Sequence, residues 1–337
     1  MRLGLRLPTY IFDPQESGQE TASLDTLLAY SRRADELGFD SLWVVDHYLV
    51  AAPSYRVAFL DPMIVLSAVI SATDRLRVGT SVLQLPLRQP VMLAKQIATL
   101  DWLSRGRFDF GIGSGWQEKE FEGAGVPIRQ RGRRLDEYLA AMIALWTEES
   151  ASFHGEFVNF DDITLLPKPV QKPYPKLSFG GGSTVPAVYA DDRGYAKPAP
   201  KTSRVLRRIG RYADAWQATS TSEPTLLERD WEEICQHAEE AGRNPSEIER
   251  MQTTYMILTE DPEEARRLYG GIVGKDFDDF LQHSSYLYGS AAKLADELHK
   301  RAEMGIDRMI LTPVRSNLDE LDEWATEFLG PFLGGQP

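Results

Sequence analysis

Strand-like and helix-like segments alternate from one end of the 337-residue chain to the other. Consecutive parallel strands need a crossover connection, which is most often a helix, so this alternation is typical of parallel βα units. Short apolar runs predict eight strands, at residues 2–8, 40–46, 76–82, 107–112, 176–180, 214–218, 251–258 and 307–312. Eight such units close into a (β/α)8 TIM barrel.

An open, doubly wound sheet is the alternative fold for the same alternation. Its glycine-rich dinucleotide-binding turn would follow the first strand. The sequence from Pro8 to Pro14 contains no glycine, which favours the barrel. We expect a single barrel domain over residues 1–337, with an insertion of hairpin-like pattern at about 152–170 and a second insertion at about 185–205.

Composition limits the classes of partner. Acidic residues outnumber basic ones by 50 to 37, which gives a net charge of −13 and argues against nucleic acid or an anionic membrane. Cys235 is the only cysteine, so an internal disulfide and a cysteine-based metal cluster are excluded. No signal-peptide pattern and no run near the ~18 apolar residues of a membrane span occur. We therefore expect a soluble protein of the reducing cytoplasm.

Two of the predicted strands end in glycine runs, and in a TIM barrel the reactive groups lie at these carboxyl ends. The run Gly111-Ile-Gly-Ser-Gly115 lacks the third glycine position of the dinucleotide motif. It fits either close packing between barrel layers or the approach of a ring or phosphate beside Ser114. The run Gly180-Gly-Gly-Ser-Thr184 is either a flexible loop tip or a set of amides aimed at an anion.

His47 follows Asp46 at the end of the second predicted strand. The simplest interpretation is a histidine held by Asp46 or by a backbone carbonyl. The five histidines of the chain show no H-x-H or H-E-x-x-H spacing, so no metal site is expected. A G-x-S-x-G turn is also absent from the sequence, which leaves acyl transfer unsupported. The strand ends suit the binding of a cofactor that carries the chemistry.

A basic stretch follows the second glycine run. Seven basic residues and no acidic one lie between Arg193 and Arg211. A solvated helical face explains them most simply, but their position also suits the counter-charges of a long anionic cofactor tail. We interpret 191–211 as an insertion after the fifth strand.

Together these segments resemble the luciferase-like flavin monooxygenase superfamily, and within it the branch that uses the deazaflavin coenzyme F-420. The resemblance covers most of the chain. It rests on residues 38–47, 77–82, 88–90, 94–100, 106–108, 111–116, 133–137, 177–182 and 211–216. It implies a homodimeric (β/α)8 barrel with a flavin-like ring across the strand ends.

The resemblance also implies roles for individual residues. His47 would be the catalytic, proton-handling group. Ser81 and Val82 would form a bulge behind the ring, which in relatives often contains a non-prolyl cis peptide. The cofactor would be bound by Asp46, Ser81, Val82, Ser114 and Gly115 and, at its phosphate, by Gly180, Gly181 and Gly182.

One position departs from the related sugar-phosphate dehydrogenases, which carry a glutamate where this chain has Trp116. The indole would form an apolar wall of the substrate site, which suits a hydrophobic or unsaturated substrate. The departure argues against sugar-phosphate chemistry.

The expected activity is hydride transfer between coenzyme F-420 and a small organic substrate. The alternatives are an FMN-dependent two-component monooxygenase that uses O2 and a flavin-binding protein without turnover. The basic stretch favours F-420, whose oligoglutamate tail is longer and more anionic than the phosphate of FMN. A homodimer is expected, and the resemblance also allows a separate cofactor reductase as a partner.

Overall fold

A closed barrel of eight parallel strands forms the centre of the molecule. The computed structural model describes residues 1–11, 22–50, 57–183, 203–218, 224–272, 286–315 and 317–333. Each barrel strand pairs in parallel with the next, and the last pairs with the first. The predicted fold is therefore confirmed. The barrel strands are β1 (Arg2–Arg6), β3 (Ser41–Val44), β5 (Arg77–Thr80), β7 (Phe108–Gly113), β10 (Lys176–Gly180), β11 (Ala215–Ala218), β12 (Glu249–Leu258) and β14 (Arg308–Pro313).

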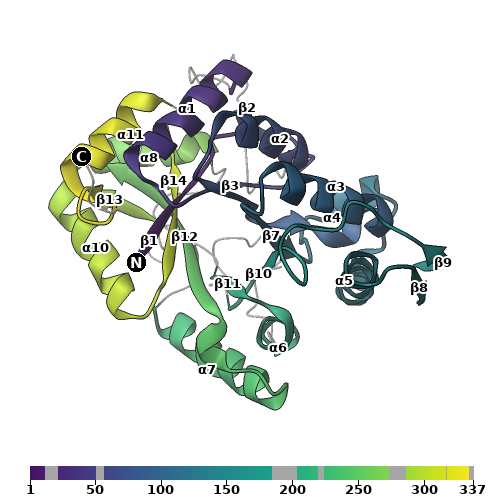
Figure 1. Cartoon of the computed structure of the whole chain (residues 1–337). Helices are drawn as coiled ribbons and strands as arrows, with labels where there is room; N and C mark the ends of the chain where they lie inside the picture. The colour runs from purple at the N-terminus through teal and green to yellow at the C-terminus, as the bar shows by residue number, and fades with distance from the viewer. Residues whose placement is uncertain are drawn as a thin grey trace.

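Helices surround this barrel and cover its outer face (Figure 1). Local sequence sets their ends. In the first helix, for example, Ser23 and Thr26 form a capping box and Gly38 ends the helix in a left-handed conformation. The helices are α1 (Leu24–Leu37), α2 (Pro62–Ala72), α3 (Pro90–Leu103), α4 (Glu118–Gly123), α5 (Arg131–Thr147), α6 (Ser203–Tyr212), α7 (Pro224–Glu240), α8 (Pro262–Ile272), α10 (Ala291–Glu303) and α11 (Leu318–Trp324).

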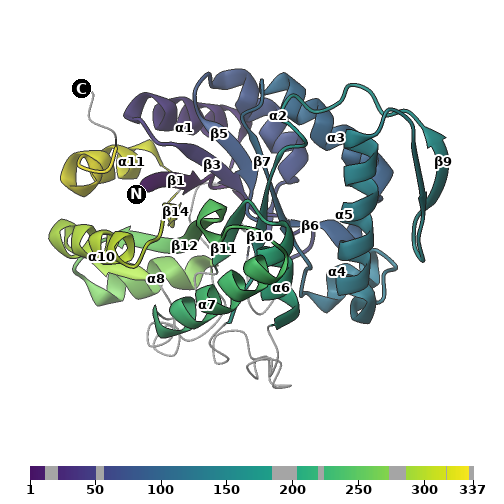
Figure 2. The same ribbon diagram turned by 60° about the horizontal axis from the view of Figure 1, so that its bottom comes forward.

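Smaller elements interrupt the βα rhythm. The expected hairpin is present as antiparallel strands β8 (Ala151–His154) and β9 (Asn159–Ile163), and it projects beyond α5 (Figure 2). The other short strands are β2 (Tyr10–Ile11), β4 (Ala58–Phe59), β6 (Leu83–Gln84) and β13 (Leu287–Gly289). Short 3-10 or π turns occur at η1 (Leu85–Leu87), η2 (Ile128–Gln130), η4 (Pro245–Glu247) and η5 (Ala325–Leu329).

The predicted insertion after the fifth strand needs correction. Residues 203–211 of the stretch 191–211 belong to α6, which is the barrel helix between β10 and β11. Leu206 and Ile209 are the fully buried apolar residues of this segment. The arginines around them made this helical pattern hard to recognise in the sequence. The remainder of the second insertion lies outside the described residues.

The barrel interior begins with an apolar layer made by Trp43, Ala215, Met251 and Ile310. The indole of Trp43 crosses the interior beside β5, where a Cβ on Gly79 would lie 2.5 Å from the ring. Side chains alternate between the two faces of a strand, so the next inward residue of each strand lies one layer nearer the carboxyl end. These next residues are Arg6, Val45, Gln217, Thr253 and Thr312. The core thus changes from apolar to mostly polar within one layer.

An ion cluster closes the opposite, amino end of the barrel. The guanidinium of Arg308 lies 5.7 Å from the centre of the Trp43 ring. It forms ion pairs with Asp40 at 3.0 Å, with Glu249 at 3.1 Å and with Asp109 at 3.4 Å. Of these contacts, the one to Asp109 also has hydrogen-bond geometry.

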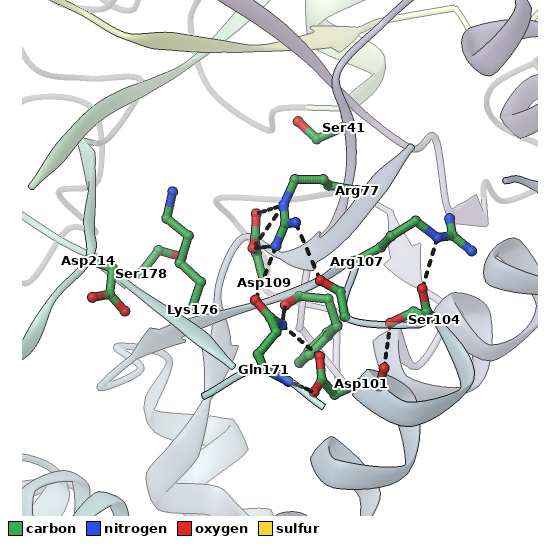
Figure 3. Close-up of polar contacts among 12 residues, drawn as sticks. Ser41, Arg77, Asp101, Ser104, Arg107, Asp109, Gln171, Lys176, Ser178 and Asp214 are labelled. Atoms are coloured by element: carbon green, nitrogen blue, oxygen red, sulfur yellow. Dashed lines mark hydrogen bonds and ion pairs between the residues drawn. The ribbon is translucent and has the colours of Figure 1, made fainter. Parts of the chain in front are cut away.

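Neighbouring side chains extend this cluster around the strand starts (Figure 3). Arg77 Nε donates to Asp109 Oδ2 at 3.1 Å. Gln171 Nε2 donates to Asp101 Oδ1 and to the Phe108 carbonyl oxygen, each at 2.6 Å. The amino end of the barrel therefore contains a cluster of ion pairs around Arg308.

Candidate functional site

A cavity of about 280 Å³ lies at the carboxyl ends of the strands, close to the lower end of the range of roughly 300–1,000 Å³ for small-molecule sites. We refer to it as the rim cavity. All of the predicted site residues except Gly182 line it: Asp46, His47, Ser81, Val82, Ser114, Gly115, Trp116, Gly180 and Gly181. Residues from β3, β5, β7 and β10 that are far apart in sequence are thus brought to one place.

His47 is held by a glutamate that the sequence did not point to. Its Nδ1 lies 3.1 Å from Glu120 Oε2 and 3.2 Å from Oε1. Glu120 comes from the short helix α4 and is fully buried. The imidazole also packs edge-on against Trp116, with ring centres 5.6 Å apart. The hypothesis that Asp46 or a backbone carbonyl holds His47 is not supported, because the partner of Nδ1 is a carboxylate 73 residues away.

The surroundings of Glu120 keep its carboxylate charged. Burial alone would raise its pKa, but the hydrogen bond and charge of His47, together with the Gln84 amide and the Leu49 N–H, outweigh burial and lower the pKa below its ordinary value. Tyr48 N donates to Oε1 at 2.9 Å, and Gln84 Nε2 donates to Oε2 at 2.8 Å. A charged carboxylate on one ring nitrogen fixes the orientation of the imidazole.

Asp46 has a structural set of contacts of its own. Its Oδ1 accepts from Arg88 at 2.7 Å and its Oδ2 accepts from the Gln84 N–H at 2.8 Å. Burial raises the pKa of Asp46, and the charge of Arg88 opposes burial without cancelling it. Asp46 lines the rim cavity, but both of its carboxylate oxygens are bonded to protein. These bonds also hold the loop that carries Gln84 and Arg88.

The predicted bulge is present after β5. The peptide bond between Ser81 and Val82 is cis, as the family resemblance implies. The glycines around it are closely packed against neighbouring parts of the chain. A Cβ on Gly113 or Gly180 would lie 2.5 Å or 2.8 Å from the Val82 side chain, and one on Gly111 would lie 1.8 Å from the Thr80 carbonyl oxygen. These glycines make room for the Val82 side chain and for the neighbouring strand, as the close-packing interpretation of the first glycine run expects.

Gly115 is the glycine of this run that needs a special backbone conformation. Its φ is +73°, in the left-handed region that other residues rarely adopt. A Cβ at this position would also lie 2.6 Å from Gln84 Oε1. The turn from Ser114 to Trp116 therefore depends on glycine, and it brings the indole over the cavity entrance.

The second glycine run is partly bonded to protein. The Gly181 N–H donates to the Gln217 carbonyl oxygen at 3.2 Å. The Ser183 N–H donates to Asp230, whose other carboxylate oxygen accepts from Ser183 Oγ at 2.7 Å. Gly182 lies beside this contact, with Asp230 Oδ2 3.0 Å from a Cβ placed on it. A carboxylate of the protein thus already holds one amide of the run.

The basic stretch gives less support to a long anionic cofactor tail than expected. Within the described residues, Arg208 is bonded to Asp136, with Nη2 2.8 Å from Oδ2. Arg211 lines a separate cavity together with Lys176 and Asp214. Lys176 lies at the amino end of β10 and Asp214 at the amino end of β11. Side chains at that end of the barrel face away from the rim cavity. Residues 193–202 lie outside the described part of the chain.

Four polar residues of the site were missed from the sequence. Arg6, Gln84, Gln217 and Thr253 line the rim cavity, and Glu120 lies beside it. A polar residue at an inward position of a predicted strand was the available signal for Arg6, Gln217 and Thr253. Glu120 gave no such signal, because it lies among the acidic residues Glu118 and Glu122 and differs from them only in its burial.

The rim cavity has unsatisfied polar atoms that fit the edge of a flavin-like ring. Gln84 Oε1, Gln217 Oε1 and Arg6 Nε are buried and have no hydrogen-bond partner. Such a ring presents both N–H and C=O groups, which would complete these contacts. Among the described residues no cluster of three or more His, Cys, Asp or Glu could hold a metal ion. No helix within the described ranges is long and apolar enough to cross a bilayer.

Comparison with known proteins gives the same family. The sequence model of the luciferase-like monooxygenases matches residues 1–195 and 199–310. An uncharacterised protein of Mycobacterium tuberculosis is 35% identical over 224 residues, which is 61% of this chain and 73% of that protein.

Two relatives with named activities use different cofactors. The FMNH2-dependent dimethylsulfone monooxygenase of Pseudomonas putida is 30% identical over 62% of this chain and 52% of its own length. The F-420-dependent glucose-6-phosphate dehydrogenase of Amycolatopsis mediterranei is 34% identical over 50% of this chain and 51% of its own. The match therefore spans about half the length of each of these two proteins.

Solved structures share the whole fold. A monooxygenase from Streptomyces bottropensis has a TM-score of 0.77 at 24% identity and covers 98% of this chain and 100% of its own. An F-420-dependent secondary alcohol dehydrogenase has a TM-score of 0.77 at 18% identity, with 99% of both chains covered. The fold, the strand-end cavity and the match of the family model agree, and the chain belongs to the luciferase-like monooxygenase family.

Proposed function

We propose that this protein is an oxidoreductase that transfers hydride between coenzyme F-420 and a small organic, mainly hydrophobic substrate. The observation that carries the proposal is the pairing of His47 with a charged, buried Glu120 at the edge of the rim cavity. Hydride transfer to or from an alcohol or carbonyl group requires a proton to move as well. An oriented imidazole beside the cavity is suited to that task.

The residues of the rim cavity would have different roles in binding and in proton transfer. Ser81, Val82, Ser114 and Gly115 would contact the ring, and Gly180, Gly181 and Gly182 would bind the phosphate. When bound, a deazaflavin supplies a ring carbon that gives or accepts a hydride. His47 would give or take the proton of the substrate oxygen, oriented by Glu120 through Nδ1. Trp116, whose side chain is 42% exposed, would form the apolar wall that excludes water from the substrate.

An FMN-dependent monooxygenase is the second candidate. The similarity to the dimethylsulfone monooxygenase favours it, and the pairing of Arg208 with Asp136 removes part of the charge argument for a long anionic tail. In that case reduced FMN would supply electrons to O2, and His47 would act as a base. A separate reductase would then be the partner that supplies reduced flavin.

The remaining proposals concern the whole protein. We propose a single domain over 1–337, a homodimer and a cytoplasmic location. The continuity of the barrel and the length of the family match support the single domain. The dimer and the location follow from the family resemblance and from the single cysteine.

Titration of the purified protein with each cofactor tests the proposed function. We expect quenching of F-420 fluorescence to saturate at lower concentration than the absorbance change of FMN. The reverse order of affinities would support the monooxygenase. A panel of secondary alcohols and enones is then added to the loaded protein. Binding of either ring without turnover of any substrate would favour a flavin-binding protein, and binding of neither ring would refute the assignment.

A further inference from the structure

Arg6 is a buried cation at the floor of the rim cavity. It is the last residue of β1 and only 8% exposed. Arg6 is the next inward-facing residue of β1 after Gly4, and Gly4 faces Trp43 in the apolar layer. Its guanidinium thus sits where the barrel core changes from apolar to polar, and it lines the cavity with Ser81, Gln217 and Thr253.

Within the described part of the chain, no carboxylate neutralises the charge of Arg6. Its Nη2 donates to Ser81 Oγ at 3.2 Å, and its Nε has no hydrogen-bond partner. Among the residues that the structure describes, no carboxylate forms an ion pair with it. The buried Arg308 and the half-buried Arg88 differ in this respect, because Arg88 pairs with Asp46 and Arg308 with Asp40, Asp109 and Glu249.

An isolated buried cation has a large desolvation cost, and arginine cannot remove the cost by losing its proton. A hydroxyl group offers no compensating charge. The arrangement is suited to a ligand that brings an oxygen with negative charge into the cavity, since a guanidinium binds such oxygens with short, directed hydrogen bonds. The two negative groups near the cavity, Asp46 and Glu120, are bonded to Arg88 and His47 and do not serve Arg6.

We infer that Arg6 is a specificity-determining residue that binds an oxyanion of the ligand at the floor of the rim cavity. Two sources share this chemistry. One is a carbonyl oxygen of the cofactor ring, which gains negative charge when the ring is reduced. The other is a carboxylate or enolate oxygen of the substrate. The inference rests on the proposed function for the identity of the first source, whereas the second source can be tested without any cofactor.

The test compares the wild-type protein with Arg6→Met, Arg6→Lys and the control Arg32→Met. Arg32 is exposed on α1, so its substitution removes the same charge far from the cavity. Unfolding in urea is measured first, without ligand. We expect Arg6→Met to be at least as stable as the wild type, because it removes an uncompensated charge. A purely structural arginine would show the opposite, a loss of stability in Arg6→Met that Arg6→Lys restores.

Binding is measured second, with oxidised and reduced F-420 and FMN and, separately, with acetate and benzoate as carboxylate probes. If the ring is the source, Arg6→Met weakens binding of the reduced ring by about ten- to hundredfold while Arg6→Lys and Arg32→Met weaken it less. If the substrate is the source, ring affinity is unchanged and the carboxylates bind the wild type but not Arg6→Met.

Equal binding of every probe by the wild type and Arg6→Met would overturn the inference. Failure of the wild type to bind any ring would refute the proposed function alone, because the carboxylate measurement on the unloaded protein still reports on Arg6.

Discussion

At the scale of single residues, the pair formed by His47 and Glu120 is the most informative contact of the site. It joins the end of β3 to helix α4, and it gives the imidazole one fixed orientation. Glu120 touches no open part of the cavity, so it acts through His47. We regard Glu120 as a positioning residue and His47 as the group that would meet the substrate.

Substitution of the two residues should affect turnover more than cofactor binding. We expect His47→Asn to lower kcat by about hundredfold or more, because proton transfer is lost. Glu120→Gln should lower kcat by about tenfold, because the amide retains the shape but not the charge. Both variants should bind the cofactor with wild-type affinity in the fluorescence titration. Unchanged kcat in His47→Asn would remove this residue from the mechanism.

Glu320 is a second carboxyl group with an unusual pKa, and it has no role in the proposed mechanism. It lies near the start of α11, 3% exposed, and Oε1 has no hydrogen-bond partner. Burial raises its pKa to about 8, with the charge of Arg315 opposing burial and that of Glu323 adding to it. The phenol groups of Tyr30 and Tyr269 also feel its charge.

This raised pKa predicts a pH-dependent stability. In the unfolded chain the carboxyl group of Glu320 loses its proton near its ordinary pKa of 4.5, whereas in the folded protein it keeps the proton up to about pH 8. The stabilisation is therefore complete at low pH and is lost as the pH rises through about 8. The loss amounts to about 1.4 kcal/mol for each unit by which the pKa is raised. Urea unfolding between about pH 5 and pH 9 should show this decline in the wild type. Glu320→Gln should flatten it, and the control Glu327→Gln, at an exposed position, should not. Equal slopes in all three proteins would contradict the assignment.

At the scale of elements, the close contact between β5 and β7 limits which residues β7 can contain. Gly111 lies so close to β5 that a Cβ would stand 1.8 Å from the Thr80 carbonyl oxygen. Thr80 Oγ1 also accepts from the Gly111 N–H at 3.0 Å and donates to its carbonyl oxygen at 2.6 Å. Backbone of a neighbouring strand cannot yield as a flexible side chain can, so this position excludes every other residue.

We therefore expect Gly111→Ala to destabilise the protein by about 3 kcal/mol or more. The control is Gly270→Ala in α8, where no described atom outside the helix's own backbone and the adjacent residues lies within 4 Å of the added Cβ. That substitution should stabilise the helix by up to about 1 kcal/mol. Thermal unfolding of the two variants beside the wild type measures both effects. Equal melting temperatures for Gly111→Ala and the wild type would show that β5 and β7 can separate at little cost.

At the scale of the whole molecule, the two ends of the barrel have different tasks. The amino end holds Arg308 among three carboxylates, and the carboxyl end holds the rim cavity with its lining of polar side chains. Stability and ligand binding should therefore respond to different substitutions.

Arg308→Met tests this division. It leaves Asp40, Asp109 and Glu249 with less compensation in a buried setting, so we expect a loss of about 3–5 kcal/mol in the free energy of unfolding. Arg77 and Lys176 still pair with two of these carboxylates, which places the loss toward the lower value. Cofactor affinity of the folded variant should remain unchanged. A variant of wild-type stability with weakened cofactor binding would contradict the division.

The alternation of strand and helix patterns determined the barrel before any coordinates, because eight parallel units have few other ways to bury both faces of their strands. The hairpin at β8–β9 and the cis peptide after Ser81 also followed from the sequence and its family resemblance. The helix α6 did not, since its arginines made a barrel helix look like a charged insertion.

Tertiary structure alone decided which side chains meet. Glu120 resembles its acidic neighbours in sequence, and only the packing of α4 against the end of β3 buries it against His47. The sequence left open what the glycines around Val82 make room for, and the structure shows that the Val82 side chain lies against Gly113 and Gly180. Whether Arg6 is paired or isolated depends on seven other strands, because charge compensation is a property of distances in space and not of order along the chain.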